Sequence, residues 1–509
     1  MRLPGRSAPA AAGLLLLVCA ASACRSDTVA PSGREALAEA VADTLPFQAR
    51  ISGGFKPSKR GPTRAAGEPP DLSPDARIAI ALMEKRAIEN PTPEAQADLG
   101  VAYLVQGDID LAIATLEDAA SELNSAAPWS DLSAAHLAKA ERAPDRRVEH
   151  LARALEAAER SLKIARSNDA LFNRALARDG LAPYTSTAAP WAEYAAAETD
   201  AAWRDAAARE AQNDHRIEDV RERWEVRRKE LTSRLRASDA AFANETARLH
   251  PEAAIEILEQ QIFVSEHSLS EADLLASAIS NATKDPLFTD EVAALRRYPA
   301  ELAVAHQQYV TGITLYGAND INRARRAMAD ALRIFRRLDA PYRLWAETRL
   351  AAADWREGHF DAALRALERL EGEARQRRYH LLLARVLVQQ AEVYRSQWRL
   401  TEALAARRAS ALQYENAGQL ENATGVYSNL ADDLRMLGES QDSWAAIGRT
   451  LQNLAHLRRP LRRYLLLYTA SLFASRDGLY HAALIFQDAA LREAQLANPD
   501  AVTEATIQR

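Results

Sequence analysis

The sequence predicts an all-α protein built as a solenoid of helical hairpins, and three observations lead to that prediction. Alanine is abundant while aromatic residues make up only 6% of the 509 residues, a mixture that favours helix over sheet. No segment sustains the alternation of apolar and polar residues that a strand would show. In the C-terminal part, matching residues return at an interval of 40, which is typical of repeat proteins.

Charge and cysteine content exclude several classes of function. The 64 basic and 70 acidic residues give a net charge of −6, which argues against a nucleic-acid partner, because domains that bind nucleic acids are strongly basic. The two cysteines, Cys19 and Cys24, both lie near the N-terminus. The folded body is therefore expected to hold no disulfide, no thiolate metal site and no cysteine nucleophile. No cofactor is expected.

The first residues resemble a bacterial lipoprotein signal peptide, predicted over 1–23. Arginines precede a short apolar stretch, which lacks the ~20 residues needed to span a bilayer. The stretch ends in Ala21-Ser22-Ala23-Cys24, which resembles a lipobox, so Cys24 is expected to carry lipid and become the mature N-terminus. The alternative is a plain signal peptide that leaves Cys24 unmodified. Arg25 follows the cysteine, which by resemblance to enterobacterial sorting favours export to the outer membrane of the cell envelope.

Residues 24–75 are predicted to be a disordered, flexible tether. Glycine and proline cluster at 53–62 and 67–70, and no apolar period is sustained, apart from a weak helix around Arg34 to Ala42. A flexible spacer of this kind would let a soluble body stand off from the membrane.

The region 76–298 begins with a helix–turn–helix unit. Its small and apolar residues recur at the spacing of a tetratricopeptide repeat (TPR), at Leu99, Gly100, Tyr103, Gly107, Ala112, Leu116 and Ala119. Gly100 allows close approach of the second helix, and Gly107 can adopt the left-handed conformation that ends a helix. Asp108 is expected to cap the second helix. The unit resembles a TPR, with an unrelated helical hairpin as the alternative.

The region 299–509 is predicted to repeat the same hairpin at a longer period. Turn residues recur 41, 40, 40 and 40 residues apart, at Gly317, Gly358, Trp398, Gly438 and Gly478. A small residue beyond each turn recurs 39, 40, 40 and 40 residues apart, at Ala324, Ala363, Ala403, Ser443 and Ala483. The TPR period is about 34 residues, and that of HEAT or armadillo repeats is about 40–47. A TPR-like variant with longer helices, as in kinesin-light-chain-like arrays, is preferred because glycine recurs at the inner turn.

Longer helices are predicted between the two repeat regions. Residues 130–178 should form two helices around Ala143-Pro144 and a third over Asn168 to Ala177. Trp191 to Leu235 should form a helical run with one break. The mixed charges of 219–230 are typical of a solvated helix face, and a coiled-coil partner is the alternative.

Three short segments resemble the N-terminal helical region of bacterial CHAT-domain proteins, in which TPRs precede a caspase-like domain. These segments are Ser130–Leu137, Ala170–Ala177 and Pro190–Tyr194. The resemblance implies a catalytic half with a His–Cys pair on the C-terminal side of the repeats. The sequence has no cysteine beyond Cys24, and its last residues look like a repeat cut off in the middle. The chain is therefore expected to be the repeat half of such a protein, with a natural stop as the alternative.

No catalytic constellation is visible. The 10 histidines show no close ligand spacing, and the phosphate-binding and serine-hydrolase motifs do not occur. The sequence therefore predicts neither a metal site nor an enzyme. Paired arginines such as Arg336-Arg337 and Arg458-Arg459 are expected to be solvated, with a surface for an acidic peptide as the alternative. Acidic pairs such as Asp432-Asp433 are expected to be solvent charges.

These observations together predict a membrane-tethered scaffold that binds partner proteins or peptides on its concave face. The expected partners are a protein or peptide and, through the lipid, a membrane; no nucleic acid is expected. The alternative function is the recognition or regulatory half of a CHAT caspase-like cysteine peptidase.

Overall fold

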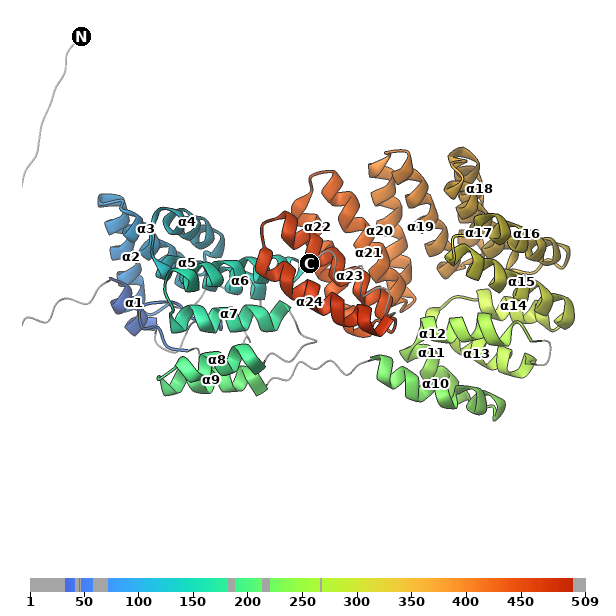
Figure 1. Cartoon of the computed structure of the whole chain (residues 1–509), viewed down its shortest axis with the longest axis horizontal. Coiled ribbons are helices and arrows are strands. Elements are labelled where there is room, and N and C mark those ends of the chain that lie inside the picture. The colour runs from blue at the N-terminus through green and yellow to red at the C-terminus, as the bar shows by residue number, and fades with distance from the viewer. Residues whose placement is uncertain are drawn as a thin grey trace, which may run out of the picture.

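The structure is a computed structural model that describes residues 33–41, 45, 47–57, 72–181, 188–212, 220–265 and 268–497. Over these residues it consists of 24 α-helices, two 3-10 turns and one π-helical turn, without a strand. Short turns join successive helices, which pack against each other as hairpins (Figure 1). The predicted all-α solenoid is confirmed.

The N-terminal part contains nine helices. Their bounds are α1 Gly33–Val41, α2 Pro74–Glu89, α3 Pro93–Gln106, α4 Ile109–Glu122, α5 Ala126–Arg142, α6 Arg147–Ile164, α7 Asn168–Leu181, α8 Ala188–Ala197 and α9 Ala201–Gln212. The first TPR-like hairpin is α3–α4. A Cβ on Gly100 of α3 would lie 2.6 Å from Cγ of Leu116 on α4, so only glycine allows this approach. Gly107 ends α3 at a φ of 95°. Asp108 occupies the N-cap of α4, but its side chain makes no capping hydrogen bond, contrary to prediction.

The middle part contains five helices and a π-helical turn. Their bounds are α10 Val220–Arg236, α11 Ala240–Leu249, α12 Pro251–Ile257, η2 Leu258–Ile262, α13 Leu269–Thr283 and α14 Leu287–Leu295. The charged helix α10 buries Trp224, Leu231 and Leu235, so one apolar edge attaches it to the body while most of its charges remain in solvent.

Five longer hairpins form the C-terminal part. Their bounds are α15 Pro299–Gly317, α16 Ile321–Arg337, α17 Arg343–Arg356, α18 Phe360–Arg377, α19 His380–Ser396, α20 Leu400–Asn416, α21 Leu420–Met436, α22 Ser440–Gln452, α23 Pro460–Arg476 and α24 Tyr480–Ala497. The residue at each predicted small position is buried on the second helix of its hairpin: Ala324, Ala363, Ala403, Ser443 and Ala483.

The inner turns follow the predicted period, with one correction. Gly358, Trp398, Gly438 and Gly478 all have a positive φ, between 60° and 83°. Gly317 instead belongs to the last turn of α15, and the residue with positive φ is Asn319. Asparagine tolerates this left-handed conformation better than most residues. With Asn319 as the turn residue, each turn stands five residues before its small position.

The C-terminal hairpins form an arc, and α10–α14 lie on its open side (Figure 1). Helix α12 contacts the C-terminal end of the arc. There Glu256 of α12 forms ion pairs with Arg458 and Arg459, which lie just before α23. The N-terminal part also contacts this end, where α6 packs against α22 and α24. There His481 lies 2.9 Å from Glu156. The arc therefore encloses an inner space bounded by helices from distant parts of the sequence.

Candidate functional site

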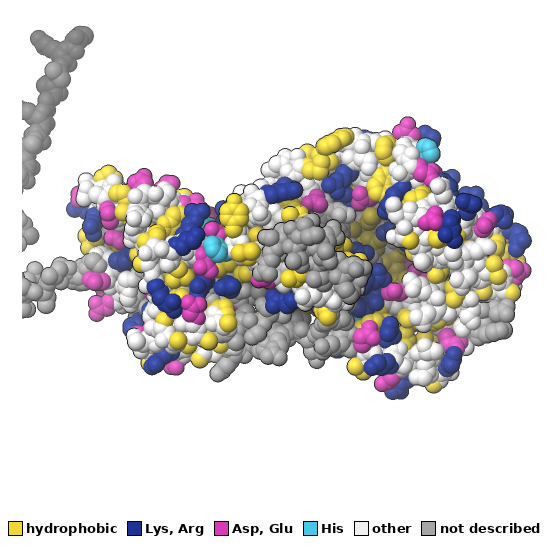
Figure 2. Space-filling model, viewed as in Figure 1, with side chains coloured by type: hydrophobic (Ala, Val, Ile, Leu, Met, Phe, Trp, Pro, Cys, Tyr) yellow, Lys and Arg dark blue, Asp and Glu magenta, His cyan; other side chains and the backbone are white. Residues whose placement is uncertain are grey.

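The inner space of the C-terminal arc contains a cavity of about 500 Å³, which we call the central pocket. Its walls come from α12, η2, α15, α17 and α19, together with Phe288 of α14, Tyr414 of α20 and residues near the starts of α21 and α23. Because α15, α17 and α19 are the first helices of their hairpins, the pocket belongs to the concave face of the array. Figure 2 shows the molecule hollowed between α15–α18 and α19–α24, with basic side chains in the wall of the hollow.

The α12 side of the central pocket is acidic, but its carboxyl groups have partners within the protein. Glu256 accepts hydrogen bonds from the guanidinium groups of Arg458 and Arg459 at 2.7 and 2.9 Å. Glu252 accepts one from the backbone N–H of Glu421 at 2.9 Å. Burial, assisted by repulsion from Glu421, raises the pKa of Glu252 to about 7. This wall is therefore satisfied without a ligand, and its negative charge is reduced at neutral pH.

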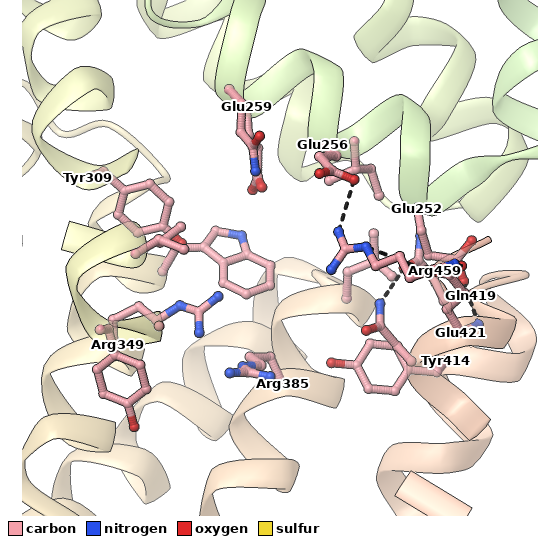
Figure 3. Close-up of a pocket in the computed structure, with 18 of the residues that line it drawn as sticks. Glu252, Glu256, Glu259, Tyr309, Arg349, Arg385, Tyr414, Gln419, Glu421 and Arg459 are labelled. Atoms are coloured by element: carbon pink, nitrogen blue, oxygen red, sulfur yellow. Dashed lines mark hydrogen bonds and ion pairs between the residues drawn. The ribbon is translucent and has the colours of Figure 1, made fainter. Parts of the chain in front are cut away.

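The opposite side of the central pocket carries cations that lack carboxylate partners. Figure 3 shows Arg349 on α17 and Arg385 on α19 facing the space beneath α12. Among the described residues, no ion pair joins either guanidinium group to a carboxylate, and the buried Nε atom of each has no hydrogen-bond partner. Burial, with repulsion from Arg349, lowers the pKa of Arg385 to about 10. Both groups remain positively charged at neutral pH.

Aromatic rings fill much of the wall between the two sides. Tyr309, Trp345 and Tyr414 line the central pocket near the arginines. Burial raises the pKa of Tyr309 to about 12, although the neighbouring Arg349 opposes the shift. These phenols therefore stay neutral, and Glu259, which lines the same pocket, attracts Arg349 without forming an ion pair with it. A site with two unpaired cations and apolar walls is suited to an anionic group attached to an apolar or planar one.

Most of the paired arginines noted in the sequence have carboxylate partners, although Arg459 also lines the central pocket (Figure 3). Arg336 pairs with Glu347, and Arg458 and Arg459 pair with Glu256 on α12. These arginines form ion pairs between packed helices and are not free to bind a ligand. The prediction of Asp433 as a solvent charge is wrong, because this residue is fully buried and accepts a hydrogen bond from Arg407 at 2.5 Å.

The single arginines of the central pocket were missed by sequence reasoning. Arg349 and Arg385 stand alone among apolar residues of inner helices and follow no common repeat position. The available signal was a charged residue on an otherwise apolar helix face. That signal does not distinguish a ligand site from an internal ion pair.

The predicted TPR positions serve packing and turn geometry rather than the central pocket. Residues between paired helices are buried, at Gly100, Ala112, Leu116, Ala119, Ala324, Ala363, Ala403 and Ala483. Leu99 and Tyr103 are half-buried. Gly107, Gly358, Gly438 and Gly478 supply the left-handed turns. The predicted lipidation site, Cys24, lies outside the described residues.

A second groove lies in the N-terminal part and contains a segment of the same chain. Residues 45 and 47–57, here called the strap, run beside α5, α7 and α9, in what we call the strap groove. The predicted flexible tether is therefore corrected for this stretch, which is folded against the body, while α1 agrees with the weak helix predicted around Arg34 to Ala42. Sequence periodicity misses the strap because it is irregular, with a turn at residues 52–54, and is held through its backbone.

Side chains of the strap groove bind the backbone of the strap. Asn173 of α7 accepts a hydrogen bond from the N–H of Arg50 and donates one to its carbonyl oxygen, each at 2.8 Å. Asp131 of α5 accepts the N–H of Ser52 at 2.8 Å. Trp203 of α9 donates its indole N–H to the carbonyl of Phe55 at 3.1 Å.

Comparison with known proteins gives no family for this chain. No protein-family model matches it, and no curated protein does. Among solved structures, the chain is similar to one described as the APC/C hetero-tetramer Cut9–Hcn1, with 14% identity, a TM-score of 0.24 and coverage of 84% of this chain and 93% of that one. It is also similar to yeast Tom70, with 14% identity, a TM-score of 0.28 and coverage of 82% and 99%. At these scores the two likenesses carry no further argument, and the hairpin packing itself identifies an all-α solenoid of TPR-like repeats.

Proposed function

We propose that this protein is a scaffold whose central pocket binds a partner protein through an acidic segment. The observation that carries the proposal is the pair Arg349 and Arg385, two cations on the concave face that have no carboxylate partner among the described residues. Like charges held together and away from water are unfavourable unless an anion joins them. A bound carboxylate would relieve this repulsion and form charge-assisted hydrogen bonds.

The size and lining of the central pocket support a peptide segment as the ligand. Ligand pockets commonly enclose about 300–1,000 Å³, and this cavity of about 500 Å³ falls within that range. It has room for a few side chains. Trp345 and Tyr414 offer flat apolar surfaces beside the arginines, so a segment that combines acidic and aromatic residues fits best.

Peptides of defined charge test this proposal. The probe is a fluorescent peptide with four glutamates and one phenylalanine, and its control has glutamine in place of each glutamate. Fluorescence anisotropy should show the acidic peptide binding the full chain about tenfold or more tightly than the control. Arg385→Gln should remove most of this preference, whereas Arg333→Gln, at an exposed residue on α16, should not. Equal binding of the two peptides would contradict the proposal.

We further propose that the scaffold is tethered to the bacterial cell envelope, most simply its outer membrane, through lipid on Cys24. The lipobox-like run before this cysteine supports the tether. Among the described helices, none combines the length and hydropathy that a transmembrane span requires. Radiolabelled palmitate should mark the wild-type chain and not Cys24→Ala, and membrane fractionation should show the same difference. Equal labelling of both chains would remove the anchor from the account.

A second candidate function is the recognition half of a CHAT caspase-like peptidase. The three segments that carry this resemblance lie in α5, α7 and α8, which pack together in the order α5, α7, α8. Phe172 of α7 contacts the rings of Trp191 and Tyr194 of α8, with centroids 5.4 and 5.2 Å apart. Sequencing the downstream DNA tests this candidate, which requires a His–Cys domain nearby. The chain alone should show no thiol-dependent peptidase activity.

A further inference from the structure

The strap groove holds the backbone of a segment that is extended over residues 49–51 and turns at residues 52–54, where Gly53 and Gly54 have φ of 96° and 88°. Three polar side chains from three helices bind the strap at residues 50, 52 and 55. Asn173 and Asp131 are fully buried in the presence of the strap. Without the strap, Asn173 would keep only its hydrogen bond to the Ser130 carbonyl at 3.1 Å, and Asp131 would keep its ion pair with Arg34 of α1 at 2.7 Å. The acceptor oxygen of Asn173 and Oδ1 of Asp131, which bind the N–H groups of Arg50 and Ser52, would lose these partners. The groove therefore favours an occupant whose backbone offers an N–H and a carbonyl group to Asn173 and an N–H to Asp131.

The strap groove also selects the side chains of its occupant. Arg50 enters an acidic recess, where its Nε lies 2.6 Å from Asp169 and its Nη1 donates to Tyr194 at 2.6 Å. The same guanidinium group pairs with Glu198 and lies over the ring of Trp203, 4.6 Å from its centroid. This combination of carboxylates, a phenol and an indole face is selective for arginine.

Apolar side chains of the strap alternate with these polar contacts. Ala49 and Ile51, on either side of Arg50, are buried, as are Phe47 and Phe55. Alternation is the expected pattern for an extended segment, whose successive side chains point in opposite directions. The groove thus fits a short sequence in which an arginine stands between two small or medium apolar residues.

We propose that the strap groove is a second peptide-binding site, specific for an extended segment with an arginine between apolar residues, and that the strap occupies this site in cis. A partner segment of the same chemistry gains access when it displaces the strap. This site differs from the central pocket in both place and charge, because it accepts a basic segment. Its test is therefore independent of the proposed function.

A chain with a weakened strap tests the proposal. The probe is a fluorescent peptide with the sequence of residues 45–57, and the variant is the full chain with Arg50→Ala. Anisotropy should show that the variant binds the probe at least tenfold more tightly than the wild-type chain, whose groove is occupied. Adding Asn173→Ala to the variant should abolish binding, and a probe that carries Arg50→Ala should bind at least tenfold more weakly. The proposal would be overturned if the folded Arg50→Ala variant did not bind the probe, or if the variant still bound the probe after Asn173→Ala was added.

A second experiment covers the case in which Arg50→Ala prevents folding, as judged by circular dichroism. A protease site is placed within 62–65 of the wild-type chain, so that cleavage breaks the covalent link between the strap and α2 while the strap stays joined to α1. Excess labelled probe should then exchange into the groove, and a probe with Arg50→Ala should not. A cleaved protein that excludes the probe, or that unfolds as the strap leaves, would show that the strap is a permanent part of the core.

Discussion

Single residues determine how closely the helices pack. The small and turn positions could be predicted because their roles are local: glycine at 107 ends a helix, and alanine at 112 leaves room for the preceding one. Arg349 and Arg385 could not be predicted as a pair, because only the curvature of the array brings them to one cavity. The sequence shows that both residues are charged, but it does not show which residues surround them in the folded protein.

Gly100→Ala should destabilise the protein, although alanine is the better helix former. Its Cβ would lie 2.6 Å from Cγ of Leu116, and such overpacking costs about 1–3 kcal/mol. The matched control is Gly372→Ala on α18, where a Cβ meets nothing within 4 Å and where alanine should add about 0.5–1 kcal/mol of stability. Urea unfolding measures both. A stabilising Gly100→Ala would contradict the close approach of α3 and α4.

Glu252 should make stability fall as pH rises. Burial raises its pKa from 4.5 to about 7, so between these values the folded protein keeps a proton that the unfolded chain has released. The free energy of unfolding therefore decreases through this window. Glu252→Gln removes the titration, and its loss of stability between pH 5 and pH 8 should be smaller by about 2–3 kcal/mol. Glu122→Gln, at an exposed residue, should follow the wild-type profile; an identical profile for Glu252→Gln would refute the assignment.

At the scale of elements, ion pairs between helices fix the register of neighbouring hairpins. The helices themselves could be predicted from composition and spacing, and the body of the protein follows that prediction. The pairing of Arg407 on α20 with Asp433 on α21 could not, because neither residue is near the other in sequence and both are fully buried. The strap could not be predicted for a related reason, because its hydrogen-bond partners are side chains on helices that are distant in sequence.

Asp433→Ala should destabilise the chain strongly. It leaves Arg407 buried with a reduced set of partners, Glu392 at 3.0 Å remaining, and breaking a buried pair costs about 3–5 kcal/mol. The double replacement Arg407→Met with Asp433→Leu should cost less than the sum of the single changes, since the two fully buried charges are removed together and only the partly exposed Glu392 and Arg395 lose a partner. Guanidinium unfolding of the three variants measures this coupling. Strict additivity would show that the pair does not act as a unit.

At the scale of the whole molecule, the proposed function depends on the closure of the arc. Helix α12 contacts residues near α21 and α23 through Glu252 and Glu256, and this contact converts an open concave face into a pocket with an acidic and a basic wall. The period of 40 residues predicted a solenoid but not its closure. Closure depends on contacts between residues more than 150 positions apart, such as Glu256 with Arg458.

Photo-crosslinking from inside the central pocket tests the account most directly. Benzoylphenylalanine replaces either Tyr316, which lines the pocket, or Tyr480, which is exposed on α24. Each chain is irradiated with the acidic glutamate–phenylalanine peptide, and mass spectrometry identifies the products. The account predicts a crosslink from position 316 that the glutamine peptide does not form, and none from position 480. Peptide binding accompanied by a crosslink from position 480 alone would contradict it.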